Sequence, residues 1–297
     1  MYPWLTTTFQ QLAKRKHTNK LHHALLLQGS LGIGKTEFAK EFASYVLCAK
    51  SSPDHACGEC QSCLLQRAGS HPDFHEVLSE KQIGVDQIRD AIKKLSGSAQ
   101  LSGAKVLIIY AAHTMTEASA NALLKTLEEP TSNTFLLLVT DKAERLLPTI
   151  ISRCERILMP PPSLSQTQSW LLTQWQDPVD EEFVQLYAHA PLILLDELQQ
   201  EQGVSYEAFK QGLQQLMTQQ INPSKLAADW QEQVEKLLSW LQFWLHQTVK
   251  KRASLSPQLW QLHQEAIKAV KRVRNPGVNK VLVLNQLLSD ISLIKNQ

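Results

Sequence analysis

Short apolar runs alternate with amphipathic segments through the first half of the chain. Five runs have the length and composition of strands, at 23–28, 74–78, 105–110, 134–139 and around 157–158. Between them apolar residues recur at helical spacing, as in 35–48, and we expect Asp86 and Thr116 to cap two further helices. Strands that alternate with helices predict a parallel sheet covered on both faces. The first half is therefore predicted to be an α/β domain.

The pattern changes after the three consecutive prolines at 160–162, which predict a linker. Beyond them Leu, Gln and Trp recur at helical spacing, and no run has the character of a strand. A weaker break near 203–205 divides this helical half. We therefore predict three domains: an α/β domain, a small helical domain and an all-α domain, at 1–162, 163–204 and 205–297.

The composition fits a multidomain globular protein that does not bind nucleic acid through its overall charge. The 297 residues are 43% hydrophobic, and 30 basic against 28 acidic residues leave a net charge of only +2. Contact with DNA would therefore need a local patch. The first residues do not follow the signal-peptide pattern, and no apolar run approaches the ~20 residues of a membrane span. The expected location is the cytoplasm.

A glycine-rich loop follows the first predicted strand and precedes a predicted helix. Residues 29–36, GSLGIGKT, match the phosphate-binding pattern G-x-x-x-x-G-K-(S/T). In such a loop, backbone N–H groups near Gly29, Gly32 and Gly34 converge on phosphate oxygens. Lys35 would reach the β- and γ-phosphates of ATP, and the Thr36 hydroxyl would bind Mg²⁺. The alternative is an ordinary glycine turn.

The acidic residues that a P-loop ATPase needs are missing from the expected strand end. Such enzymes hold Mg²⁺ and polarise the attacking water with acidic side chains there. The strand at 105–110 instead leads into Tyr110 and Ala111, which can do neither. Glu117 and Asp141 are the nearest acidic alternatives in the sequence. The pattern predicts ATP binding with poor hydrolysis.

Four of the five cysteines fall within sixteen positions. Cys48, Cys57, Cys60 and Cys63 supply four thiolates, two of the intervals being Cys-x-x-Cys. This set fits a closed, tetrahedral Zn²⁺ site without an open coordination position. A structural zinc module at 48–63 is therefore predicted, with buried free thiols as the alternative.

Several longer motifs carry a family resemblance. They are Tyr2-Pro3-Trp4-Leu5, His22-His23-Ala24-Leu25-Leu26, Cys57-Gly58-x-Cys60-x-x-Cys63, His71-Pro72-Asp73-Phe74, Gly84-Val85-Asp86, Ala120-Asn121-Ala122-Leu123-Leu124-Lys125-Thr126-Leu127-Glu128-Glu129-Pro130, Glu144-Arg145-Leu146-Leu147-Pro148 and Ser152-Arg153-Cys154. Together they closely resemble the delta-prime subunits of the bacterial DNA polymerase III clamp loader, AAA+ proteins related to the gamma/tau subunits. The resemblance is strong to about position 160 and returns at 275–280, NPGVNK.

The resemblance implies a RecA-like AAA+ domain, a small helical lid and a C-terminal helical collar. Collars of this family join gamma/tau, delta and delta-prime subunits into an open ring, which uses ATP to load the sliding clamp onto primed DNA. By the same resemblance, Arg153 is an arginine finger that enters the neighbouring subunit's ATP site. Thr140 occupies the sensor-one position of the chain's own nucleotide site.

Two departures from the family's active ATPases bear on activity. Those subunits carry Asp-Glu where this chain has Tyr110-Ala111, and a lid arginine that the corresponding segment 188–192 lacks. Both favour a delta-prime subunit without ATPase or polymerase activity of its own. The alternatives are an ATP-hydrolysing gamma/tau-type subunit, and a zinc-dependent DNA-binding module with a relict phosphate loop. The near-neutral charge counts against the last.

Overall fold

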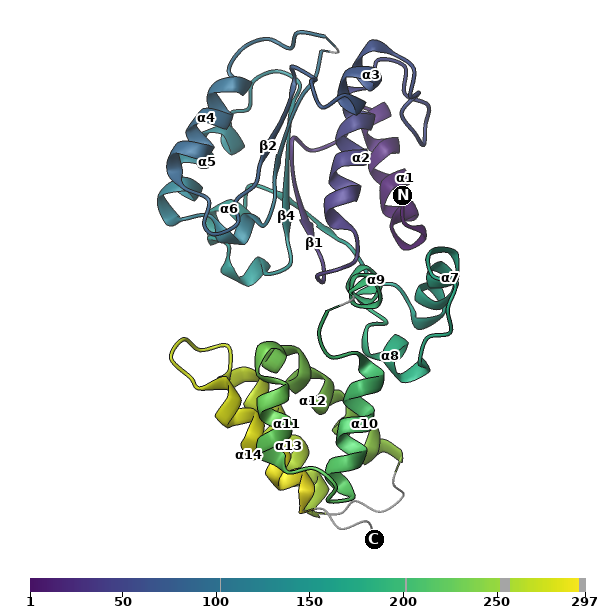
Figure 1. Ribbon diagram of the computed structural model, residues 1–297. Coiled ribbons are helices and arrows are strands. Elements are labelled where there is room, and N and C mark those ends of the chain that lie inside the picture. The colour runs from purple at the N-terminus through teal and green to yellow at the C-terminus, as the bar shows by residue number, and fades with distance from the viewer. Residues whose placement is uncertain (102, 201, 252–256, 294–297) are drawn as a thin grey trace. The chain divides into compact units, whose positions relative to one another are not determined.

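The computed structural model describes residues 1–101, 103–200, 202–251 and 257–293 (Figure 1). The chain forms two compact units, Met1–Pro178 with Tyr187–Glu197, and Val179–Leu186 with Leu198–Gln297. The segment predicted to be a separate lid is thus shared between the two units, and the three-domain division stays a prediction. Within the described ranges, no helix is both long and apolar enough to cross a membrane.

A five-stranded parallel sheet forms the centre of the first unit, which confirms the predicted α/β class. The strands follow the order β2-β3-β4-β1-β5, with bounds β1 Ala24–Gln28, β2 Phe74–Val77, β3 Lys105–Ile109, β4 Thr134–Thr140 and β5 Glu155–Leu158. Every residue of β3 and β4 is buried, whereas the edge strand β5 alternates between half-buried and exposed. The central strands read as continuous apolar runs because helices cover both of their faces.

Helices pack on both faces of this sheet, α1 and α2 on one and α4 and α5 on the other (Figure 1). The helices of the first unit are η1 Pro3–Leu5, α1 Thr6–His17, α2 Lys35–Leu47, α3 Gln61–Arg67, α4 Val85–Leu95, η2 Ala112–Thr114, α5 Glu117–Glu128, η3 Ala143–Arg145, α6 Pro148–Ile151, α7 Leu164–Gln174 and α9 Pro191–Gln199. One apolar core contains Phe9 of α1 and Phe42 of α2, and a second contains Ile88 of α4 and Leu123 of α5. Two separate cores are the expected result of covering both faces of one sheet.

Of the two predicted helix caps, one is confirmed and one is wrong. Thr116 caps α5 as predicted, since its hydroxyl accepts from the N–H of Ser119 at 3.2 Å. Asp86 was predicted to cap α4, but the N-cap is Gly84, whose N–H donates to the Gln87 side chain at 2.9 Å. Asp86 lies instead in the first turn, where its charge complements the helix dipole.

The second unit is all helical in its described part, which confirms the predicted helical C-terminal region. Its elements are α8 Glu181–Leu186, α10 Tyr206–Met217, α11 Pro223–Asp229, η4 Gln231–Gln233, α12 Val234–Lys251, α13 Pro257–Arg272 and α14 Lys280–Ser292. Trp240 of α12 lies edge-on to Tyr206 and Phe209 of α10, with ring centroids 5.4 Å apart in each pair. This aromatic cluster anchors the two helices to each other.

Candidate functional site

The predicted phosphate loop lies between β1 and α2, as a strand-loop-helix binding site requires. Gly29 donates its N–H to the carbonyl of Thr140 at 3.3 Å, so the loop starts beside the end of β4. Gly32 and Gly34 have φ angles of 76° and 85°, a left-handed conformation that favours glycine. The loop ends at the N-terminus of α2, where helix N–H groups and the helix dipole favour an anion. The structure thus brings Lys35, Thr36 and Thr140 to one edge of the sheet.

The ammonium group of Lys35 contacts its own loop. Its Nζ donates to the carbonyl of Ser30 at 2.5 Å, and the side chain is buried. Burial lowers the pKa of Lys35, and the carboxylate of Asp141 opposes that shift. The ammonium group has three N–H donors, so the Ser30 carbonyl occupies one of the donors that a phosphate group in this loop would use.

Aromatic residues from the start of the chain also pack on the loop. The indole N–H of Trp4 donates to the carbonyl of Ile33 at 2.9 Å, and Tyr2 stacks on Trp4 with ring centroids 5.2 Å apart. A Cβ atom on Gly34 would lie 2.2 Å from ring carbons of Tyr2. The only sequence signal for this contact is the family motif that begins at Tyr2, and that motif does not indicate which loop it packs on.

Helix α9 closes on the same loop from another direction. The N–H of Leu192 donates to the carbonyl of Gly32 at 3.1 Å. A Cβ atom on Gly32 would lie 2.7 Å from the Cγ1 atom of Ile193. Glycine at position 32 is therefore required both by its backbone conformation and by the close approach of α9.

The end of β3 presents a phenol where an ATPase would have a carboxylate. The hydroxyl of Tyr110 donates to the Glu76 carboxylate on β2, and Lys40 lies 3.8 Å from the same carboxylate. Burial raises the pKa of Tyr110, and the hydrogen bond to Glu76 raises it further. Tyr110 therefore stays neutral, and its oxygen is engaged with β2.

Of the two acidic alternatives, Asp141 lies within electrostatic reach of the phosphate loop. Its carboxylate partly offsets the lowering of the Lys35 pKa by burial, and its Oδ1 lies 3.3 Å from Nδ1 of His113. The same His113 nitrogen lies 3.1 Å from the hydroxyl of Thr140. Glu117 is exposed in the first turn of α5. Asp141 is thus already engaged with a histidine.

The four predicted cysteine ligands converge. Their Sγ atoms all lie within 4.8 Å of one another, and those of Cys48 and Cys57 are 3.5 Å apart. Tetrahedral Zn²⁺ with bonds of about 2.3 Å sets its sulfur ligands about 3.8 Å apart. The N–H of Cys57 donates to Sγ of Cys48 at 3.3 Å, and that of Cys60 to Sγ of Cys57 at 3.4 Å. This geometry fits a four-thiolate metal site.

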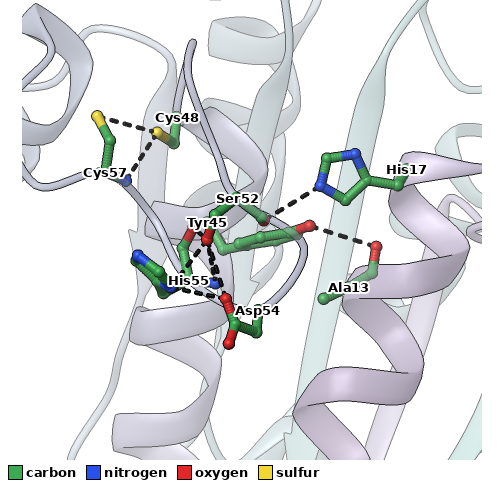
Figure 2. Close-up of polar contacts among 8 residues, drawn as sticks. All are labelled: Ala13, His17, Tyr45, Cys48, Ser52, Asp54, His55 and Cys57. Carbon is green, nitrogen blue, oxygen red and sulfur yellow. Dashed lines mark hydrogen bonds and ion pairs between the residues drawn. The ribbon is translucent and has the colours of Figure 1, made fainter.

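A contact with α1 and hydrogen bonds within the loop hold the segment that joins the first two cysteines (Figure 2). Nε2 of His17 lies 3.1 Å from the carbonyl of Ser52, and the Ser52 hydroxyl donates to Asp54 at 3.0 Å. His55 pairs with Asp54 at 2.7 Å, so its ring is engaged within the loop. The fifth cysteine, Cys154, is buried away from the cluster, and burial raises the pKa of its thiol to about 12.

Arg153 lies on the edge of the sheet opposite to the phosphate loop. The loop follows the carboxyl end of β1, Arg153 precedes the amino end of β5, and these neighbouring strands are parallel. The Arg153 side chain is one-third exposed, at 33%, and lines an open recess of about 790 Å³ together with Lys20 and His23. Its guanidinium is therefore directed away from the chain's own nucleotide site.

Comparisons with known proteins agree on one family. A family model described as DNA polymerase III, delta subunit, matches residues 4–163. The delta' subunit of DNA polymerase III from Pseudomonas aeruginosa is 39% identical over 77% of this chain and 71% of its own length. The delta' subunit from Yersinia pestis is 32% identical over 100% of this chain and 89% of its own length.

A solved structure supports the same fold. It is a DNA polymerase III gamma subunit-related protein from Thermotoga maritima, with a TM-score of 0.55 and 18% identity over 95% of this chain and 98% of its own. At this identity the likeness concerns the fold alone. It agrees with the predicted arrangement of a parallel sheet domain followed by helices.

Proposed function

Because this chain belongs to the family of DNA polymerase III delta' subunits, we propose that it is a subunit of the clamp loader in DNA replication. Its partners would be the gamma/tau and delta subunits, and through the assembled ring the sliding clamp and primed DNA. In this proposal the α/β domain extends over 1–162, the lid over 163–204 and the collar over 205–297. The collar would join the subunits of the ring.

The mechanistic core of the proposal is that Arg153 acts as an arginine finger on the neighbouring subunit. The observation that carries it is the position of Arg153 on an open recess, on the sheet edge opposite to the chain's own phosphate loop. During phosphoryl transfer, negative charge spreads over the γ-phosphate oxygens, and a guanidinium from a neighbour stabilises it. Arginine suits this role because its planar N–H groups can donate to two oxygens at once.

The chain's own phosphate loop is proposed to bind ATP with Mg²⁺ and to hydrolyse it poorly. Its binding groups would be the loop residues and the sensor-one hydroxyl: Gly29, Gly32, Gly34, Lys35, Thr36 and Thr140. The strand-loop-helix geometry supports binding, and the neutral Tyr110 next to β3 argues against efficient hydrolysis. The bond between Lys35 and Ser30 argues for modest affinity.

The cysteine cluster is proposed to bind one structural Zn²⁺. The four sulfurs would complete a tetrahedral coordination shell and leave no open position for catalysis. The proposed metal would link the end of α2 to α3, because Cys48 is the C-cap of α2 and Cys63 lies within α3.

Arg153→Ala in the reconstituted complex tests the finger. A finger contributes roughly 10³–10⁵ to the rate at its own site, so the neighbouring site should become nearly inactive. Total ATPase stimulated by clamp and primed DNA should fall in part, because the other sites keep their own arginines. Clamp loading should fall further, since the cycle needs all sites. Arg89→Ala is the matched control, as Arg89 is an exposed arginine on α4.

Two results would overturn the proposal. If Arg153→Ala leaves ATPase and clamp loading at wild-type rates in an intact complex, Arg153 is an ordinary surface residue. If the isolated chain turns over ATP at ~1 s⁻¹ or faster, it is an ATPase of the gamma/tau type rather than a weakly hydrolysing subunit.

A further inference from the structure

We propose that Glu128 is a positioning residue for Arg153, holding the guanidinium in the orientation in which it meets the neighbour's phosphate. The inference rests on the proposed function, since it concerns the same arginine. Glu128 is the last residue of α5, and Arg153 follows α6, so the two come together only through the fold. No local sequence pattern links residues 25 positions apart.

The carboxylate of Glu128 holds one side of the guanidinium. Nε of Arg153 donates to Oε1 of Glu128 at 2.7 Å, and Nη2 forms an ion pair with the same oxygen. Two nitrogens on one acceptor fix the rotation of the guanidinium plane more firmly than a single bond would.

The backbone of α6 holds the third nitrogen. Nη1 of Arg153 donates to the carbonyl of Thr149 at 3.0 Å, with a longer contact of 3.4 Å to the Ser152 hydroxyl. An arginine has five N–H groups, and these contacts strongly engage three of them. Among the contacts of the described residues, one N–H on Nη2 and one weakly engaged N–H on Nη1 remain. That pair matches two oxygens of a phosphoryl group.

The surroundings leave room for such a group. Arg153 lines the recess of about 790 Å³, where Lys20, His22 and His23 are also found. Glu128 is not among the residues of that recess. Glu128 and the Thr149 carbonyl therefore hold Arg153 from the side and leave the recess open to an incoming phosphate.

Holding the finger in place raises the rate because the arginine loses less rotamer freedom in the transition state. A catalytic group that is already oriented avoids that loss of freedom at the moment of reaction. The ion pair itself is exposed, at 33% for Arg153 and 49% for Glu128, and exposed pairs contribute little to folding stability. Removing the Glu128 charge should therefore change turnover and leave the fold unchanged.

Glu129 provides a matched control in the next position. It has the same charge, is exposed, and its carboxylate forms no hydrogen bond or ion pair within the described part of the chain. Glu128→Gln keeps the size and one acceptor oxygen but removes the charge that binds the guanidinium. Glu129→Gln makes the same chemical change without touching Arg153.

The experiment compares Glu128→Gln, Glu129→Gln, Arg153→Ala and the double variant Glu128→Gln/Arg153→Ala in the reconstituted complex. The readouts are kcat and KM of the ATPase stimulated by clamp and primed DNA. Glu128→Gln should lower the Arg153-dependent part of kcat by about three- to tenfold with KM unchanged. Glu129→Gln should match wild type, and the double variant should match Arg153→Ala, because the two residues act as one unit. Glu128→Asp, which keeps the charge with a shorter reach, should fall between wild type and Glu128→Gln.

Each outcome has a distinct meaning. If Arg153→Ala lowers the ATPase rate and Glu128→Gln leaves it unchanged or raises it, the positioning role of Glu128 is wrong. The arginine-finger role of Arg153 is then still supported. If Glu128→Gln lowers the rate equally in the Arg153→Ala background, Glu128 acts elsewhere and the inference fails. If Arg153→Ala has no effect, the finger and its positioning residue fail together. Thermal unfolding of each isolated variant shows that the fold is retained.

Discussion

The phosphate loop precedes α2 and the cysteine cluster follows it, yet the two loops differ in what their ligand-binding groups contact. At the first end, Lys35 is bonded to its own loop, and Trp4 donates to the Ile33 carbonyl. At the other end, four sulfurs face one another within 4.8 Å. A binding motif states which groups are present, and the contacts around it decide whether those groups are free for a ligand.

The thiols of the cysteine cluster differ in acidity. Burial raises the pKa of Cys63 to about 12, and the neighbouring Cys60 adds to that shift. Burial acts in the same direction on Cys60, but hydrogen bonds from the backbone of Cys63 and Ala49 and from the side chains of Cys63 and Cys57 together outweigh it and lower the pKa of Cys60 to about 6. Thiols this close cannot all ionise without mutual repulsion, and a divalent cation would stabilise all four thiolates.

The largest effect is expected from Cys60→Ser, which removes one of the four thiolates. The variant should lose most of its bound zinc and unfold more easily, by about 3 kcal/mol or more, because metal binding adds to folding free energy. Elemental analysis and thermal unfolding of protein purified without chelator measure both changes. Cys154→Ala, away from the cluster, should keep its zinc. A zinc-to-protein ratio near zero in the wild-type protein would contradict the metal site. Neither end of α2 would then have ligand-binding groups that are free for a ligand.

The next effect concerns the phosphate loop itself. Lys35→Ala should lower the affinity for Mg-ATP by about 10- to 100-fold, the range expected for one hydrogen bond to a charged group. Trp4 lies on the loop, so tryptophan fluorescence during an ATP titration can report binding, with calorimetry as a check. Lys14→Ala, an exposed lysine on α1, should bind as wild type does. Equal affinity in both variants would mean that the loop is not the binding site.

A smaller effect, opposite in sign, should follow from loosening the contact between α9 and the loop. Ile193→Ala removes the side chain that approaches Gly32, and the affinity for ATP should rise about two- to fivefold as conformations with α9 farther from the loop become more populated. Leu172→Ala is the control, because Leu172 on α7 is 80% exposed. An unchanged or lower affinity would show that α9 does not restrict the loop.

The smallest effect is expected at the end of β3. Tyr110→Phe removes the hydrogen bond to Glu76 and should destabilise the protein by about 1 kcal/mol or less, because the partly exposed Glu76 regains water. Urea unfolding measures this change. ATPase activity should not appear, since phenylalanine cannot hold Mg²⁺ either. A gain in ATP turnover would show that the site has the catalytic groups it needs and that Tyr110 blocks them.

Several features of this protein were determined by its sequence alone, because they depend on neighbouring residues. The buried strands β1, β3 and β4 could be predicted since each is a continuous apolar run covered on both faces. The cap at Thr116 depends on a residue three positions away. The cysteine set could be recognised from its spacing, because two-residue intervals place thiols close together in any compact loop.

Only the tertiary structure decided which distant side chains meet. Tyr110 bonds to a residue 34 positions earlier and Arg153 to one 25 positions earlier, and Tyr2 and Ile193 reach the phosphate loop from well outside it. Periodicity shows which face of an element is buried, but it carries no information about the element that packs against that face. Those contacts arise from the order of the strands and from the placement of helices on the sheet. The strand order also places Arg153 far from the phosphate loop, because the end of β1 and the start of β5 lie on opposite edges of the sheet.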